Sequence, residues 1–126
     1  MLDTLALYSF MFFSAVLILF QLSLALGAPW GAASMGGKYP GVYPSKMRFV
    51  AVVNAAVIGL LSAVVLAHAE FAFPVLHSIT NWAIWIVAAF YGLSIIMNSI
   101  TPSKIERIWA PVALLQTLSV LYIALN

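Results

Sequence analysis

The chain has 126 residues, of which 65% are hydrophobic and only 6% are charged, and its formal net charge is +2. Ordinary soluble domains carry about 25% charged residues, so this composition excludes a soluble fold with a polar surface. The few scattered cations also exclude a nucleic-acid-binding surface, and the absence of cysteine excludes disulfides and thiolate metal sites.

Four long apolar runs predict four membrane-spanning helices. They cover residues 5–26, 49–69, 79–100 and 108–125. The connection at 27–48 joins the first two spans, and the connection at 101–107 joins the last two. Each run can cross about 30 Å of hydrocarbon at a rise of about 1.5 Å per residue. Residues 1–126 are therefore expected to form one all-α transmembrane domain, a four-helix bundle. The first run is expected to be a retained span, because Met1–Thr4 contains an acid and no Lys or Arg, unlike a secretory signal.

The distribution of cations predicts the orientation. All five lie in the first and third connections, which share one side of a four-span bundle: Lys38, Lys46, Arg48, Lys104 and Arg107. Basic residues in short connections stay cytoplasmic. Both termini and residues 70–78 are therefore expected to be extracytoplasmic, and a dual-topology dimer is disfavoured.

The connection at 27–48 holds five of the seven glycines and three of the six prolines. Gly27 is a candidate C′ residue that ends the first span, with Pro29 behind it. Aromatic residues such as Trp30 suit the headgroup layer. Two interpretations stay open: a surface connection, or a hairpin that re-enters the membrane where protein covers its backbone.

One amide from each span is expected at a common depth. Gln21, Asn54 and Gln116 lie about 9–10 Å from the cytoplasmic ends of their spans, and Asn98 about half as deep. These amides either bond to one another and to serines across helix interfaces, or line a polar vestibule for a small solute.

Near the other end, His68, Glu70 and His77 supply side chains that bind zinc or copper. The spacing of His68 and Glu70 places them on different faces of a helix, however, and Pro74 interrupts the path to His77. A metal site here is the minor alternative to ordinary interfacial residues, and no particular cofactor is indicated.

No Asp, Glu, Lys or Arg lies within the predicted spans. Proton-coupled transporters and acid–base catalysts within the bilayer need such groups. We therefore expect the protein not to be an enzyme or a proton-driven antiporter.

Two local patterns add detail. The segments PSKMR (44–48) and PSKIER (102–107) precede spans two and four, as expected if one hairpin had been duplicated, and Ser103 with Glu106 forms a candidate capping box. Small residues at every fourth position of span two (Ala51, Ala55, Gly59, Ala63) favour close packing, within the chain or between chains.

The run ALGAPWGAASMGGKYPGVYPSKMR, with Asn98 and SKIERIWAPV downstream, resembles a family of small four-span bacterial membrane proteins to which no activity is assigned. The resemblance covers nearly the whole chain and implies a bacterial plasma membrane, but it carries over no functional residue. Small multidrug antiporters match poorly, because the first span has no Glu.

Three functions follow as hypotheses. The first is an accessory subunit that docks on other membrane subunits, or on itself, through the small-residue stripe and the connection with Trp30, Lys38, Lys46 and Arg48. The second is a small homo-oligomeric transporter or channel for a neutral or anionic solute, using the amides, with Lys38 or Lys46 attracting anions. The third is a metal- or cofactor-binding protein using His68 and His77. Membrane lipids are expected partners in each case, and nucleic acid in none.

Overall fold

The computed structural model describes residues 1–126 and contains only helices and their connections. Four long helices each have the length and apolar composition of a membrane span. The elements, in chain order, are α1 (Leu2–Ala25), η1 (Gly31–Ala33), η2 (Met35–Gly37), α2 (Ser45–His68), η3 (Pro74–Ile79), α3 (Thr80–Ile100), η4 (Glu106–Ile108) and α4 (Trp109–Leu125). The predicted all-α, multi-pass, four-helix bundle is confirmed.

The helix ends follow from local sequence. Gly27 adopts a positive φ of 105° after α1, and the Ala28 amide returns to the Ser23 carbonyl at 2.9 Å. Gly27 is thus the C′ residue expected from the sequence. Pro111 lies in the first turn of α4, where its missing N–H removes no helical hydrogen bond. It marks the start of the helix and not a kink within it.

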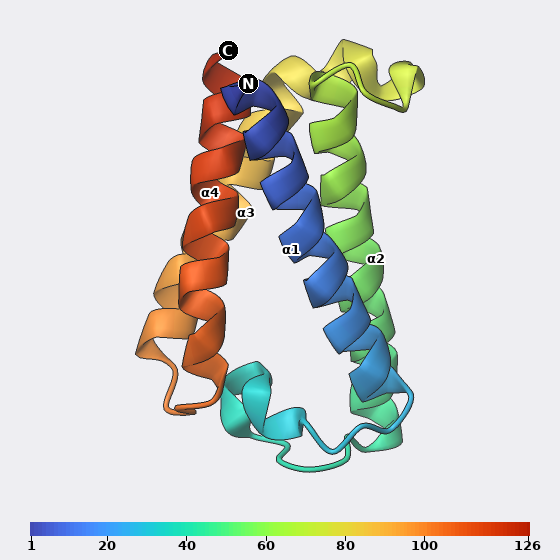
Figure 1. The fold of residues 1–126 in the computed structure, drawn as a ribbon. Helices are drawn as coiled ribbons and strands as arrows, with labels where there is room; N and C mark the ends of the chain where they lie inside the picture. The colour runs from blue at the N-terminus through green and yellow to red at the C-terminus, as the bar shows by residue number, and fades with distance from the viewer.

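The four helices form two antiparallel hairpins, α1 with α2 and α3 with α4 (Figure 1). Both chain termini lie at one end of the bundle, called here the termini end. The segments 26–44 and 101–108 lie at the opposite end, called the loop end. In Figure 1, α1 and α4 are close together at the termini end and diverge toward the loop end.

The main hydrophobic core lies in the half of the bundle nearer the termini end. It contains residues from all four helices: Leu7, Phe10, Val64, Val65, Ala83, Ile84, Val87, Ala88, Tyr91, Val120 and Ile123. A smaller cluster joins α1 and α2 near the loop end, around Leu24, Tyr43, Met47 and Ala51. Ala51 and Ala55 of the small-residue stripe are buried within the chain, whereas Gly59 and Ala63 are half-buried.

The two PSK segments make equivalent contacts. Arg48 donates from Nε to the Tyr43 carbonyl at 3.0 Å, and Arg107 donates from Nε to the Thr101 carbonyl at 3.1 Å. Tyr43 and Thr101 each directly precede the proline of their segment. In both cases the arginine side chain closes the turn that leads into a helix.

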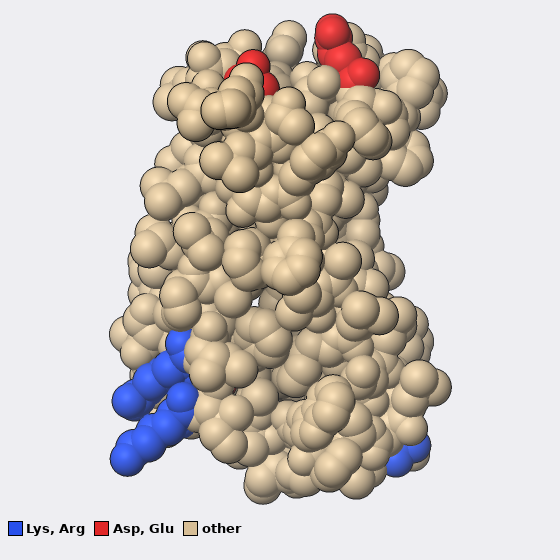
Figure 2. Space-filling model, viewed as in Figure 1, with Lys and Arg blue, Asp and Glu red and all other residues tan.

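The cations gather at one end of the bundle. Figure 2 shows Lys and Arg side chains at the loop end and acidic side chains at the termini end of the same face. All five cations belong to segments at the loop end, because 38–48 and 104–107 both lie there.

Candidate functional site

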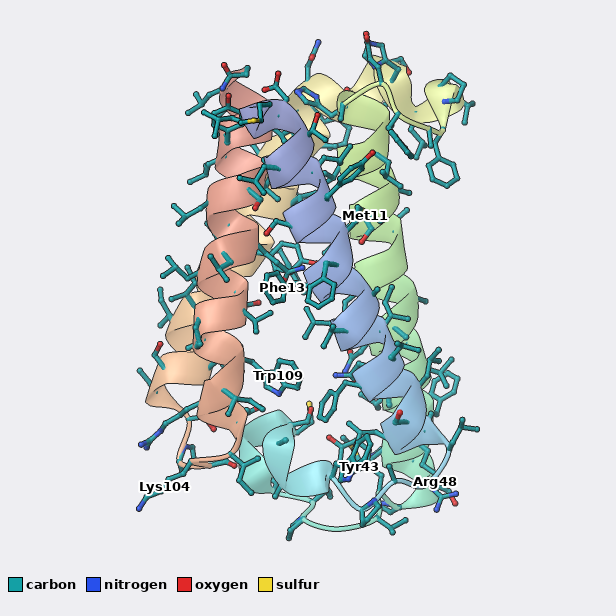
Figure 3. All side chains as sticks on the ribbon, in the orientation of Figure 1. Met11, Phe13, Tyr43, Arg48, Lys104 and Trp109 are labelled. Atoms are coloured by element: carbon teal, nitrogen blue, oxygen red, sulfur yellow. The ribbon has the colours of Figure 1, made fainter.

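A cavity of about 930 Å³ occupies the half of the bundle nearer the loop end, where the two hairpins diverge. All four helices and the segment between α1 and α2 contribute to its wall. On the face shown in Figure 2 the surface is hollowed between α1 and α4. Figure 3 shows Trp109 of α4 projecting into the space between these two helices.

The four amides singled out by the sequence all line this one cavity: Gln21, Asn54, Asn98 and Gln116. They do not bond to one another. Asn98 donates to the Ser94 carbonyl of its own helix at 2.8 Å, and Gln116 donates from Nε2 to Ser14 Oγ at 3.0 Å. The side-chain oxygens of Gln21 and Gln116 are buried without any hydrogen-bond partner.

The most deeply buried polar residues of the cavity wall are Tyr91 and Gln116, which are 1% and 0% exposed, and Ser14, which is 1% exposed, lies behind Gln116 as its hydrogen-bond acceptor. The Tyr91 side chain approaches Ser14 and Gln116, yet its hydroxyl has no hydrogen-bond partner. Phe10 packs edge-on against the Tyr91 ring, with centroids 5.4 Å apart, and closes the site toward the termini end. Sequence reasoning missed Ser14 and Tyr91, because a lone hydroxyl in mid-span carries no pattern that shows which face it occupies.

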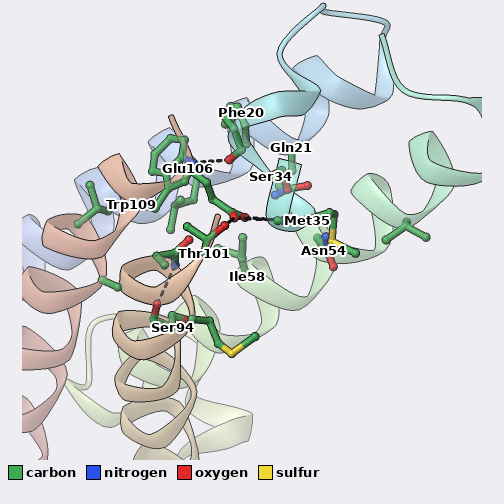
Figure 4. Close-up of a pocket in the computed structure, with 18 of the residues that line it drawn as sticks. Phe20, Gln21, Ser34, Met35, Asn54, Ile58, Ser94, Thr101, Glu106 and Trp109 are labelled. Carbon is green, nitrogen blue, oxygen red and sulfur yellow. Dashed lines mark hydrogen bonds between the residues drawn. The ribbon is translucent and has the colours of Figure 1, made fainter. Parts of the chain in front are cut away.

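The segment 31–37 covers the loop end of the cavity and is fastened to the α3–α4 connection. The Gly36 amide donates to the Glu106 carboxylate at 3.1 Å, and Trp109 donates from Nε1 to the Ala33 carbonyl at 2.9 Å. Ser103 Oγ donates to the Ala32 carbonyl. Figure 4 shows Glu106 and Thr101 reaching toward Met35, with Gln21 and Asn54 on the far side. This segment therefore lies across the diverging helix ends (Figure 1).

The capping box expected at Ser103 and Glu106 forms only in part. The Glu106 amide donates to Ser103 Oγ at 3.3 Å. The Glu106 carboxylate does not return to the Ser103 amide, which instead donates to Thr101 Oγ1. The carboxylate instead accepts hydrogen bonds from the Gly36 amide of the covering segment and from the Thr101 hydroxyl of its own connection.

Backbone packing explains why glycines collect in this segment. Gly31 donates its amide to the Gly41 carbonyl at 2.9 Å, and a Cβ on Gly31 would lie 1.8 Å from the Tyr39 carbonyl oxygen. Only glycine fits there.

Tyr43 follows this glycine-rich segment and is 2% exposed. Burial raises the pKa of its phenol above the ordinary value of 10.0.

The only charged residues that line the cavity are Lys38 and Glu106, both at the loop end. Glu106 forms no salt bridge with Lys or Arg. The other residues proposed for the cytoplasmic connection lie outside the cavity wall: Trp30 is half-exposed, Lys46 is exposed, and Arg48 is half-buried against Gly27.

At the termini end, the structure brings Glu70 and His77 together but not His68. His77 Nε2 lies 3.6 Å from Glu70 Oε1, and both side chains are more than half exposed. His77 Nδ1 lies 3.2 Å from the Ala67 carbonyl. No three His, Asp or Glu side chains are grouped closely enough to hold a metal ion.

Together these observations define a class: a multi-pass membrane protein with an all-α four-helix bundle and a mainly apolar cavity to which each helix contributes an amide. Comparisons with protein-family models, with curated proteins and with solved structures find no match to this chain. The resemblance to a four-span bacterial family therefore stays an expectation from the sequence.

Proposed function

We propose that this protein binds a small uncharged molecule within the membrane, in the cavity between its two hairpins, as a carrier of that molecule. One observation carries the proposal: each helix supplies an amide to the same cavity, and the oxygens of Gln21 and Gln116 there are buried without partners. An unpaired buried polar group costs about 1–3 kcal/mol. A ligand that completes these hydrogen bonds is stabilised by the same amount.

The size and composition of the cavity support a small-molecule ligand. Binding cavities typically enclose about 300–1,000 Å³ and combine apolar walls with a few polar groups, and this one encloses about 930 Å³. The two charged residues of the cavity wall, Lys38 and Glu106, have opposite signs and both lie at the loop end. Their charges offset each other, so an uncharged ligand is favoured over the anion that Lys38 or Lys46 alone would attract.

A carrier fits the fold better than an open channel. The half of the bundle nearer the termini end is closed by the main core, which includes the fully buried Phe10, Ile84 and Val120. A molecule in the cavity therefore crosses only after the hairpins move relative to each other.

The cations support one orientation for this carrier. Placing all five on the cytoplasmic side makes the loop end cytoplasmic and both termini extracytoplasmic. The cavity then lies in the inner half of the bilayer. A bacterial plasma membrane location is supported by the sequence resemblance alone.

The test is to look for a bound molecule. Wild-type protein and a Gln21→Leu, Asn54→Leu, Gln116→Leu variant are purified in mild detergent, and their organic extracts are compared by mass spectrometry. The wild type should yield a stoichiometric small molecule that the variant lacks, while Ser99→Ala, an exposed hydroxyl on α3, should behave as wild type. Equal extracts from a folded variant would contradict the proposal.

The accessory-subunit hypothesis stays a prediction. The mass of the particle purified in mild detergent distinguishes it from the carrier. A persistent unrelated partner in the purified particle would favour it, whereas a particle containing only this chain would favour the carrier.

A further inference from the structure

The deepest part of the cavity indicates what kind of group it binds. Tyr91 and Gln116 line the cavity and are almost completely buried, and the Tyr91 hydroxyl and the Gln116 carbonyl oxygen have no partner. Since about 90% or more of buried polar groups in proteins are paired, these two atoms mark a place where a bound group completes the hydrogen bonding.

The two atoms also define the chemistry of that group. An amide oxygen only accepts, whereas a phenol hydroxyl both donates and accepts. A hydroxyl or a primary amide on the ligand satisfies both atoms. A charged group does not fit, because the charged lining residues, Lys38 and Glu106, lie at the loop end, and an unpaired charge at this depth is very costly.

Around these polar atoms the cavity wall is mainly apolar. Residues from all four helices cover it: Leu17, Phe20, Val50, Ile58, Phe90 and Val112. A ligand that fills the cavity must therefore bury apolar surface of its own, which adds about 25 cal/mol per Å² to its binding.

On the side of α2 and α3, the cavity wall is only one side chain thick in places. Val57 of α2 and Met97 and Ile100 of α3 line the cavity and are also exposed on the outside of the bundle. Because these residues belong to helices with the length and composition of membrane spans, this side of the cavity wall faces lipid. The loop end is covered by the segment 31–37, which Glu106 and Trp109 hold in place.

We propose that the ligand is a membrane-dissolved amphiphile. Its uncharged hydroxyl or amide head binds Tyr91 and Gln116, and its apolar chain leaves the cavity between α2 and α3. This inference rests on the proposed small-molecule binding function and adds the class of ligand and its route.

The experiment uses Trp109, which lines the cavity, as a fluorescent reporter. In a Trp30→Phe, Trp82→Phe, Trp85→Phe background reconstituted in lipid nanodiscs, three quenchers are titrated: brominated dodecanol, brominated dodecanoate and bromoethanol. We expect saturable quenching by brominated dodecanol, with about tenfold weaker apparent affinity for the carboxylate and for the short alcohol. Quenching that rises linearly with concentration reports only partitioning into lipid and is subtracted.

Two variants assign the saturable component to the polar pair. Gln116→Leu and the conservative Tyr91→Phe, which removes only the hydroxyl, should each weaken it about tenfold, while Ser99→Ala on the outer surface of α3 should leave it unchanged. If both Tyr91→Phe and Gln116→Leu kept the saturable quenching of the wild type, the inference would be overturned.

The quenchers also separate this inference from the broader function. Saturable quenching by bromoethanol that equals that of the long alcohol would overturn the amphiphile and leave a carrier of small polar molecules. If neither alcohol gave saturable quenching, the proposal of an amphiphilic ligand would be overturned. If the wild-type extract also contained no bound molecule, the carrier function would be contradicted as well.

Discussion

The Glu106 carboxylate accepts a hydrogen bond from the Gly36 amide at 3.1 Å, across 70 residues of sequence. The contact joins the segment that covers the cavity to the connection between α3 and α4. Glu106 is the acidic residue of the cavity wall, and it holds the cover in place without forming a salt bridge. A charge-assisted hydrogen bond therefore helps to hold the segment that covers the loop end of the cavity.

Removing that carboxylate should loosen the cover. Hydrogen bonds to charged groups contribute about 1.5–3 kcal/mol, so Glu106→Ala should speed amide exchange at Gly36 and its neighbours by about tenfold to a hundredfold. Hydrogen–deuterium exchange with mass spectrometry measures this directly. Glu70→Ala, which removes an exposed carboxylate at the opposite end, is the control. Unchanged exchange at 31–37 would show that the contact does not hold the cover.

Gly31 should tolerate no side chain. A Cβ there meets the Tyr39 carbonyl oxygen at 1.8 Å and the Gly41 carbonyl oxygen at 2.8 Å, and both belong to backbone that cannot rotate away. We expect Gly31→Ala to destabilise the protein by about 1–3 kcal/mol, the usual range for overpacking. Gly59→Ala is the matched control, because nothing lies within 4 Å of its added Cβ. Melting temperatures in detergent compare the two, and equal values would refute the packing of this segment.

Much of this arrangement can be predicted from the sequence, and the reason is the regularity of the helix. Counting residues from the span ends placed Gln21, Asn54 and Gln116 at a common depth, and all three line the cavity. Counting does not predict how far two helices diverge, so the cavity itself could not be foreseen. The capping box at Ser103 and Glu106 was a sound local expectation that failed in part because Gly36, far away in the sequence, competes for the same carboxylate.

The pair Ser14 and Gln116 should show an asymmetric response to mutation. Ser14→Ala leaves the Gln116 amide buried without its acceptor, which should destabilise the protein by about 1–3 kcal/mol. Ser14→Ala combined with Gln116→Leu removes both polar groups and should be nearly neutral. Denaturation in detergent compares the variants. If the double variant were less stable than Ser14→Ala alone, the pair would contribute more than this hydrogen bond.

Tyr43 should make stability fall at alkaline pH. Burial raises the pKa of its phenol above 10.0, so the folded state holds the proton after the unfolded state has lost it. The resulting contribution is therefore fully present below about pH 10 and is lost as the pH rises further, toward the folded pKa. Melting temperatures of the wild type and Tyr43→Phe should diverge above about pH 10, with the wild type falling faster. Parallel curves would mean that this phenol titrates normally.

The proposed orientation can be tested because the chain contains no cysteine, so a single introduced thiol is unique. Lys46 and Ser78 are both exposed and lie at opposite ends of the bundle. If the cations are held on the cytoplasmic side, a membrane-impermeant maleimide added to intact cells should label Ser78→Cys and not Lys46→Cys. Permeabilised cells should label both, which controls for thiol reactivity. If only Lys46→Cys were labelled in intact cells, the orientation would be the opposite of the proposed one, and the cavity would lie in the outer half of the bilayer.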